Sequence, residues 1–358
     1  MSFQWPVDAE DLFDERYPQM VNTGLPAQDV DEVRAAITEM WPDAPGGWVC
    51  EWSALAARYV AQGQHQLASL AYGWAKFPTL ADDTKRLALQ RQLEQYLLAA
   101  TDFGVDFERR VLDVAYQGAS TPVPVHIFAA PGLAADAPVL LASGGVDSWK
   151  MDMHAMFVLA ALTAGVRVVA FDIAGTGEST VQMTPGGGAE IVRGLIAEAR
   201  ALGNGVVVHL GISMGGHYSA HSGLAGEVDA AIVLGGPVED AFSKDASMLQ
   251  FGMDGIVGNA LGFDRRPSAE ELAAAVSTFS LRPLLDQDIN APMLVVNGAD
   301  DVHVPQHDTL VFEGRRDTEV HLIPDTGHCA TSKLPEVIPL MFGWLQRALE
   351  TVAQRANS

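Results

Sequence analysis

The stretch VVVHLGISMGGHYSA, residues 206–220, decides the fold. It begins as a run of apolar residues that suits a buried strand, turns through Gly211 and Gly215, and continues in small residues that suit a helix. Ser213 stands at the corner, between the two glycines. A G-x-S-x-G pattern between a strand and a helix is typical of a tight, strained turn that exposes the serine hydroxyl. The stretch therefore predicts a strand, a nucleophilic Ser213 and a helix, in that order.

Other short apolar runs extend this strand into a sheet. They lie at 139–143 (VLLAS), 167–172 (RVVAFD), 230–234 (AAIVL), 293–298 (MLVVNG) and 319–323 (EVHLI). Such runs suit parallel strands buried on both faces, and helical patterns fall between them, for example at 188–202 and 335–352. The alternation predicts an open, mostly parallel α/β sheet flanked by helices. Before it, residues 109–116 and 123–130 predict a strand pair joined by a turn at 117–122 (QGASTP).

The same patterns divide the chain into regions. Residues 1–105 read as a helical segment, with helical spacing around Trp52 and Trp74 and a third helix over 80–100. The α/β core is expected at 106–236 and 291–358. The interval 237–290 is too long for a simple crossover, and its SAEE pattern, Ser268 with Glu271, predicts a capped helix. We therefore expect a helical lid there, over the carboxyl ends of the strands.

Two partners for Ser213 follow later strands. A serine hydroxyl needs a base to take its proton and a carboxylate to orient that base. Asp300 and Asp301 come just after the run at 293–298, and His328 follows the run at 319–323. From its spacing to the neighbouring glycine and proline, Asp301 is the predicted acid, and Asp300 is interpreted as a turn-capping carboxylate. We expect His328 to be the base, and structural or peripheral roles for three other histidines: His217, His303 and His321.

Acyl transfer also needs donors for the oxyanion. One is the predicted backbone N–H of Met214, directly after the nucleophile. The second is expected from the loop GGVDSW, residues 144–149, where paired glycines allow close approach of the backbone. Gly145 and Val146 are the two candidates.

Composition excludes several other classes. The chain of 358 residues carries a formal net charge of -23, which argues against binding to nucleic acid or to an anionic membrane surface. No cysteine–histidine spacing suggests zinc, and GTGEST at 175–180 lacks the residues of a phosphate-binding loop, so we expect no metal and no cofactor. Two cysteines, no basic and apolar leader and no long apolar segment favour a cytoplasmic protein without a membrane span.

Several motifs together resemble one branch of the α/β-hydrolase superfamily. They are ASGGVDSWKMD, FDIAGTGEST, GISMGGHYSA, NGADDVHVP and DTGHCA. The branch contains the FrsA-like esterases, 2,6-dihydroxypseudooxynicotine hydrolase and fungal heptaketide-shortening hydrolases, and the resemblance extends through the helical segment to nearly the whole chain. It implies the α/β-hydrolase fold, Ser213, Asp301 and His328 as the triad, and often a homodimer.

The expected function is hydrolysis of an acyl bond in a small to medium, mostly apolar ketone or ester. The resemblance alone favours cleavage of a carbon–carbon bond next to a ketone, as in a β-diketone or aryl ketone (a retro-Claisen reaction). That chemistry calls for a further acid near the leaving carbon, and the candidates are Glu239, Asp240 and Asp245. The alternatives are a carboxylesterase or lactonase, an acyltransferase or a lyase or cyclase of polyketide-like biosynthesis, and a non-catalytic binding protein on a hydrolase scaffold.

Overall fold

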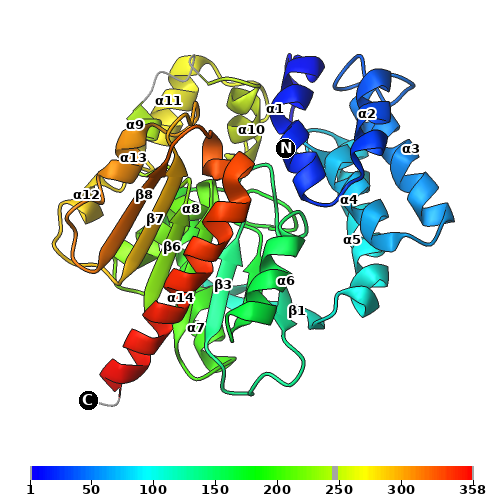
Figure 1. The fold of residues 1–358 in the computed structure, drawn as a ribbon. Coiled ribbons are helices and arrows are strands. Elements are labelled where there is room, and N and C mark those ends of the chain that lie inside the picture. Colours follow the sequence, from blue (N-terminus) through cyan, green and yellow to red (C-terminus); the bar gives the residue numbers. More distant parts are fainter. Residues whose placement is uncertain (1, 244–248, 357–358) are drawn as a thin grey trace. The chain divides into compact units, whose positions relative to one another are not determined.

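The computed structural model describes residues 2–243 and 249–356, which form two compact units (Figure 1). The first, here called the helical unit, comprises residues 1–104, 151–153 and 245–272. The second, the α/β unit, comprises residues 105–150, 154–244 and 273–358. All the described residues predicted for the site belong to the α/β unit, so this unit is described first.

An eight-stranded sheet forms the centre of the α/β unit, in the order β1-β2-β4-β3-β5-β6-β7-β8. The pairs β1–β2 and β2–β4 are antiparallel, and every other pair is parallel. The strands are β1 (Asp106–Tyr116), β2 (Ala119–Ala129), β3 (Val139–Ser143), β4 (Arg167–Phe171), β5 (Val207–Ile212), β6 (Ala230–Leu234), β7 (Met293–Gly298) and β8 (Thr318–Ile323). The mostly parallel sheet predicted from the apolar runs is thus confirmed.

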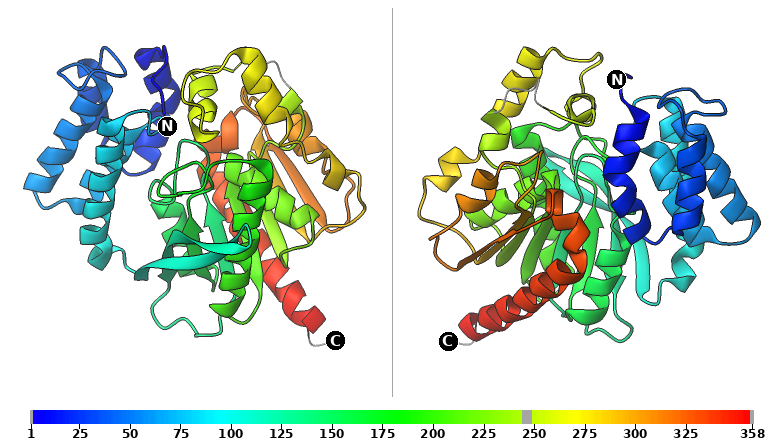
Figure 2. Two further views of the ribbon diagram at one scale, coloured as in Figure 1. Left: turned by 180° about the vertical axis from the view of Figure 1, so that it is seen from behind. Right: turned by 45° about the horizontal axis from the view of Figure 1, so that its top comes forward.

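Helices cover both faces of this sheet, which explains the burial of its central strands. Every residue of β3, β5, β6 and β7 is buried. Helix α6 (His154–Thr163) packs on β2 and β4 and contacts α14 (Leu334–Ala356) on one face. Helix α7 (Pro185–Ala201) packs on β1, and α8 (Met214–Leu224) packs on β5 and β6, on the other face (Figure 2). Strands with two covered faces favour apolar residues, and these strands are apolar at most positions; the exceptions are Ser143, His209 and Asn297.

The first hairpin differs from its prediction. The turn between β1 and β2 is only Gln117–Gly118, and the residues from Ala119 onward already belong to β2. Both turn residues have positive φ, 50° at Gln117 and 74° at Gly118. Two successive positive φ angles make the two-residue turn whose twist matches that of the flanking strands. The predicted turn at 117–122 was therefore too long, because the strand pairing overrides the turn propensity of Ser120 and Pro122.

Short helices connect the later strands. Those within the α/β unit are α9 (Asp240–Ser243), α12 (Arg282–Leu285), α13 (Gln306–Leu310) and the 3-10 helix η3 (His328–Lys333). Helix α11 (Ala269–Ser277) begins with the predicted capping box: the N–H of Ser268 donates to Glu271 Oε2 at 2.8 Å, and the N–H of Glu271 donates to Ser268 Oγ at 3.2 Å. The region predicted as a helical insertion contains α9, α10 (Met253–Ala260), α11 and α12.

The helical unit contains α1 (Ala9–Asn22), α2 (Ala27–Ala36), α3 (Trp48–Ala61), α4 (His65–Lys76), α5 (Asp83–Ala99), the 3-10 helix η1 (Ala100–Asp102) and α10. Its core is aromatic: Phe13 stacks on Trp52, and Trp48 and Trp74 both pack against Phe77. Helix α10 is attached by Asn259, which accepts from the N–H of Phe3 at 3.1 Å and donates to its carbonyl at 3.0 Å. Among the described residues, every helix is too short or too polar to span a membrane.

Candidate active site

Ser213 occupies a sharp turn between β5 and α8. Its backbone angles are φ 56° and ψ -124°, a combination that side chains rarely adopt. The turn is held because the Ser213 N–H donates to the carbonyl of Leu234 on the neighbouring strand β6, at 2.8 Å. Strain at this position fixes the direction of the serine side chain relative to the sheet.

The glycines on either side of Ser213 are required by close backbone approaches. A Cβ atom on Gly211 would lie 1.9 Å from the carbonyl oxygen of Gly215. A Cβ on Gly215 would lie 2.3 Å from the carbonyl oxygen of Gly144. Both distances are far below van der Waals contact, so any larger residue would push the strand, the helix and the loop after β3 apart. The G-x-S-x-G spacing is thus a steric requirement of this turn.

His328 joins Ser213 to Asp301. Its Nε2 lies 2.9 Å from Ser213 Oγ, and its Nδ1 lies 2.6 Å from Asp301 Oδ2. Because a carboxylate only accepts, the neutral ring carries its proton on Nδ1, and Nε2 then accepts from the serine hydroxyl. Three segments supply these groups: the turn after β5, the loop after β7, and the start of η3 after β8. Asp300, by contrast, is exposed, and its N–H donates to the carbonyl of Thr326.

The charges of the pair support each other. Burial would raise the pKa of Asp301, but the charge and hydrogen bond of His328, together with Asn297 and the N–H of Val304, lower it to about 2. For His328, burial lowers the pKa, whereas Cys329 and the Asp301 carboxylate raise it. The resulting pKa of His328 lies well above the ordinary histidine value. Asp301 therefore stays ionised at neutral pH and stabilises the imidazolium form of His328.

The loop after β3 approaches Ser213. A Cβ atom on Gly145 would lie 2.8 Å from Ser213 Cβ and 3.1 Å from its Oγ. The N–H of Gly145 donates to the carbonyl of Ser148 at 2.9 Å, so it is already committed within the loop. Among the described residues, no carbonyl accepts from the N–H of Val146 or of Met214. Of the two candidates in this loop, Val146 therefore keeps a free donor and Gly145 does not.

A buried ion cluster anchors the end of this loop. Lys150 is fully buried, and its Nζ lies 2.5 Å from Asp172 Oδ2 and 2.7 Å from Glu178 Oε2. Asp172 also accepts from the backbone N–H groups of Lys150 and Glu178, at 2.9 Å each. Arg109 adds a second cation beside Glu178, so two cations meet two carboxylates. The cluster fixes the segment 144–150 against the end of β4, and the sequence patterns gave no role to any of its members.

The other histidines take different positions. His217 is buried in α8, and its Nδ1 donates to the carbonyl of Pro237 at 3.2 Å, as suits a packed structural residue. His321 lies in β8, 3.8 Å from Glu319. The His303 ring, which we expected to lie away from the site, packs edge-on against His328 with 5.5 Å between ring centroids. Its backbone N–H also donates to Asp301 at 2.8 Å.

The acids predicted to assist carbon–carbon cleavage have other partners. Glu239 lies 3.2 Å from Arg282 and 3.6 Å from His307. Among the described residues, neither Glu239 nor Asp240 is hydrogen-bonded to Ser213 or His328. Asp245 lies outside the described residues. The described part of the chain has one group of side chains that could hold a metal ion: Glu239, Asp240 and His307, whose ligand atoms lie within 4.8 Å of one another. Glu239, however, already forms an ion pair with Arg282.

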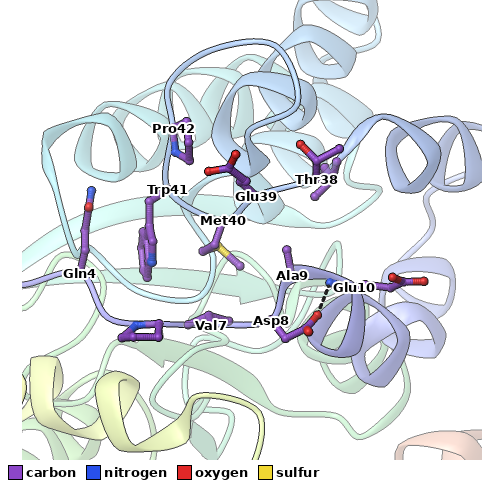
Figure 3. A pocket seen from close by; sticks show the side chains of 12 residues that line it. Gln4, Val7, Asp8, Ala9, Glu10, Thr38, Glu39, Met40, Trp41 and Pro42 are labelled. Carbon is purple, nitrogen blue, oxygen red and sulfur yellow. Dashed lines mark hydrogen bonds between the residues drawn. The ribbon is translucent and has the colours of Figure 1, made fainter.

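A cavity of about 840 Å³ lies within the helical unit, between residues 4–10 and residues 37–42 (Figure 3). Its wall includes Asp8, whose carboxylate accepts from the N–H groups of Glu10 and Asp11 and so caps α1. None of the predicted site residues lines this cavity. It is therefore separate from the group around Ser213.

Comparison with known proteins places this geometry in context. No protein-family model matches the chain. The chain is 24% identical to Esterase FrsA of Photobacterium profundum over 311 residues, which cover 79% of this chain and 72% of that protein.

Two solved structures cover nearly the whole chain. AbyA5 superposes with a TM-score of 0.79 and 19% identity over 96% of this chain and 99% of its own. The 2,6-dihydroxy-pseudo-oxynicotine hydrolase superposes with a TM-score of 0.74 and 22% identity over 93% of this chain and 95% of its own. The chain therefore has the α/β-hydrolase fold and resembles the branch of that superfamily that includes Esterase FrsA and 2,6-dihydroxy-pseudo-oxynicotine hydrolase.

Proposed function

We propose that this protein is a serine hydrolase that cleaves an acyl bond in a small to medium, mostly apolar ketone or ester. The observation that carries the proposal is the continuous chain of hydrogen bonds from Ser213 through His328 to Asp301, at 2.9 Å and 2.6 Å. The resemblance of the protein to Esterase FrsA and to 2,6-dihydroxy-pseudo-oxynicotine hydrolase supports hydrolase activity on this scaffold. Ser213, His328, Asp301 and the two proposed oxyanion donors all belong to the α/β unit.

The first half of the reaction forms an acyl-enzyme. Ser213 Oγ attacks the substrate carbonyl carbon while His328 Nε2 takes its proton. The Asp301 carboxylate stabilises the imidazolium that forms, consistent with the raised pKa of His328. The developing oxyanion accepts from the N–H of Met214 and the N–H of Val146. Among the described residues, neither N–H donates to a backbone carbonyl.

Departure of the leaving group completes the first half, and the second half releases the acyl group. The imidazolium of His328 donates its proton to the leaving atom as the bond to the carbonyl carbon breaks. Water then attacks the acyl-enzyme, with His328 as base, and the carboxylic acid leaves as Ser213 regains its proton. The bond that breaks in the first half, carbon–oxygen or carbon–carbon, decides what His328 must protonate.

The more specific proposal is cleavage of a carbon–carbon bond next to a ketone. The leaving carbon must then carry negative charge, which an adjacent carbonyl or a phenol ring delocalises. The resemblance to 2,6-dihydroxy-pseudo-oxynicotine hydrolase supports this bond type. Glu239, Asp240 and Asp245 stay predictions as assisting acids, and Glu239 is paired with Arg282.

Ester hydrolysis is the second candidate, and one observation favours it. An alkoxide leaving group needs only the proton of His328, and the described hydrogen bonds around Ser213 include no other acid. The curated relative Esterase FrsA agrees with this bond type. An acyltransferase or lyase, a homodimeric state and a cytoplasmic location stay predictions.

The test compares an aryl ester with its β-diketone analogue, each incubated with wild type and with Ser213→Ala. Preferential cleavage of the diketone by wild type alone supports the carbon–carbon hydrolase, and cleavage of the ester alone supports the esterase. Full activity of Ser213→Ala on either substrate contradicts the serine mechanism. A fluorophosphonate probe adds an independent reading: labelling of folded wild type but not of Ser213→Ala excludes the non-catalytic binding protein.

A further inference from the structure

Asn297 is a buried polar residue inside a strand whose other side chains are apolar. It stands next to last in β7, MLVVNG, and is fully buried. A buried amide is costly unless its donor and its acceptor are both satisfied. Here both are, and the two partners belong to the two loops that carry Asp301 and His328. This makes Asn297 a link between the acid and the base.

On one side, the amide fixes the carboxylate. Asn297 Nδ2 donates to Asp301 Oδ2 at 2.8 Å. The same oxygen accepts from His328 Nδ1 at 2.6 Å. The other oxygen, Oδ1, accepts from the N–H groups of His303 and Val304 at 2.8 and 3.1 Å. Four donors thus hold the carboxylate, and Asn297 is the one that comes from a strand of the sheet.

On the other side, the amide holds the loop that carries His328. Asn297 Oδ1 accepts from the N–H of Cys329, the next residue along, at 3.0 Å. Cys329 and Ala330 have φ angles of 56° and 49°, so this loop is strained and persists only where its surroundings fix it. The thiol of Cys329 contributes a weaker contact with the carbonyl of Leu234, at 3.5 Å.

Only an amide satisfies both loops at this position. The group facing Asp301 must donate, because the carboxylate only accepts, and the group facing Cys329 must accept from an N–H. Aspartate keeps the acceptor but places a second carboxylate oxygen against Asp301, and alanine supplies neither group. The amide orientation is therefore dictated by its two partners.

We propose that Asn297 is a positioning residue for the reaction, which holds the Asp301 carboxylate and the His328 loop in register through one side chain. The inference rests on the proposed function, because it assigns Asn297 a task only if Asp301 and His328 act together. The titratable groups that face His328 are Asp301 and His303 from the loop after β7, and its chain neighbour Cys329.

The test measures kcat, KM and the pH profile of kcat/KM for Asn297→Asp and Asn297→Ala, beside wild type and Ser213→Ala. Asn290→Asp is the matched control, since Asn290 lies in the same unit and its amide donates to the carbonyls of Ala291 and Arg316. Thermal unfolding of each variant reports folding. If Asn297→Asp fails to fold, Asn297→Ser takes its place, because serine is small and its hydroxyl adds no charge beside Asp301.

A positioning role predicts distinct results for the variants. Asn297→Asp adds negative charge beside Asp301, so the rise of kcat/KM with pH moves up by about one pH unit. Asn297→Ala, and Asn297→Ser to a smaller extent, lower kcat by about 10- to 100-fold with KM within about twofold. For Asn290→Asp we expect a change in thermal unfolding only, with kcat, KM and the pH profile as in wild type.

Two outcomes overturn the inference: a wild-type pH profile for folded Asn297→Asp, or wild-type kcat for folded Asn297→Ala or Asn297→Ser. Either of them together with inactive Ser213→Ala leaves the proposed function intact. Activity of Ser213→Ala instead overturns the proposed function itself.

Discussion

The helical unit and the α/β unit are built from different cores. The helical unit packs large rings, with Phe13, Trp48 and Trp52 within contact of one another. The sheet of the α/β unit is filled by aliphatic side chains, and every residue of its central strands is buried. Aromatic rings give the small helical unit much buried area per residue, whereas the sheet gains its area from many short strands.

The two units also differ in the strain of their backbones. Among the described non-glycine residues, only Phe251 has a positive φ in the helical unit. In the described part of the α/β unit, six such residues have positive φ: Gln117, Ser213, Asp317, Asp325, Cys329 and Ala330. Three of them, Ser213, Cys329 and Ala330, lie at or beside the hydrogen bond between Ser213 and His328. Strained residues cost stability and persist where the fold over-determines them. Half of these strained positions in the α/β unit thus lie at the candidate site, whereas packing in the helical unit serves stability.

The strongest test of this contrast replaces the strained serine. Ser213→Ala and Ser213→Gly both remove the proposed nucleophile, and we expect each to lower kcat by about 10⁴- to 10⁶-fold. Glycine accepts a positive φ without strain, so Ser213→Gly should be more stable than Ser213→Ala by about 1 kcal/mol. Chemical denaturation of the two variants measures the difference. Equal stability would mean that Ser213 stores no strain.

The second test removes the acid partner. Asp301→Asn should lower kcat by about 10³- to 10⁴-fold. The amide no longer stabilises the imidazolium, and it no longer favours the neutral tautomer that carries its proton on Nδ1. The pH profile of kcat/KM shows in which direction Asp301 shifts the pKa of His328. Asp301 raises the pKa of His328, so wild-type kcat/KM should rise with pH around a midpoint above the ordinary histidine value, as His328 loses its proton. In Asp301→Asn that midpoint should move to lower pH; an unmoved midpoint would contradict the coupling.

The third test moves to the helical unit. Trp52 is fully buried and packs on Phe13, Trp48 and Trp74. Trp52→Ala should destabilise this unit by about 3–5 kcal/mol through the cavity that it leaves. Val60→Ala, a change at a partly buried position in the same helix, serves as the control with a smaller expected loss. Hydrogen exchange resolved along the chain measures both. Protection lost in the α/β unit to the same extent would show that the two units do not unfold separately.

The fold could be predicted because each central strand is recognisable from its own residues. A mostly apolar run needs no knowledge of its partners to indicate a strand with two covered faces, and β3, β5, β6 and β7 all follow that pattern. The order of serine, aspartate and histidine along the chain also indicated which strand ends to compare, because carboxyl ends of parallel strands meet at one edge of a sheet.

The remaining features depend on contacts that no local pattern encodes. Gly145 and Val146 are equivalent in the sequence, and only the loop's own bond from Gly145 to Ser148 distinguishes their N–H groups. Lys150 looks like a surface lysine until Asp172 and Glu178 are brought to it from β4 and its turn. Asn297 gave one signal, a lone amide in an apolar strand, which in a buried strand requires polar partners.

The fourth test adds one methyl group beside the nucleophile. In Gly145→Ala the new Cβ would lie 2.8 Å from Ser213 Cβ, so the loop or the serine must shift. We expect kcat to fall by about 10- to 100-fold, because small displacements of reacting groups cost this much. Gly186→Ala in α7 is the matched control, since its Cβ would meet no atom within 4 Å. Steady-state kinetics compare the two, and equal effects would show that the approach of Gly145 to Ser213 is not tight.

The smallest expected effect concerns a buried cation of the helical unit. Lys85 is almost fully buried, and its Nζ donates to the carbonyls of Ala75 and Phe77. Burial, offset in part by Asp82 and reinforced by Lys76, lowers the pKa of Lys85 to about 7. Between pH 7 and the ordinary lysine pKa of about 10.4, the unfolded chain binds a proton that the folded unit does not. Stability of the helical unit should therefore rise with pH across that window.

Lys85→Met removes the proton-binding group and should flatten this rise, at a cost of about 1 kcal/mol near pH 7 for the two lost hydrogen bonds. Lys333→Met, in the α/β unit, should leave the rise unchanged. Tryptophan fluorescence during denaturation at pH 7.0 to 9.5 (about 0.5-unit steps, all below the ordinary lysine pKa) reports mainly on the helical unit. That unit contains Trp5, Trp41, Trp48, Trp52 and Trp74, whereas the α/β unit contains Trp149 and Trp344. A rise that persists in Lys85→Met would mean that Lys85 keeps its proton when folded, held by the two carbonyls. In that case the helical unit, like the α/β unit, would stabilise a buried charge through fixed hydrogen bonds, and the contrast between the units would reduce to strain alone.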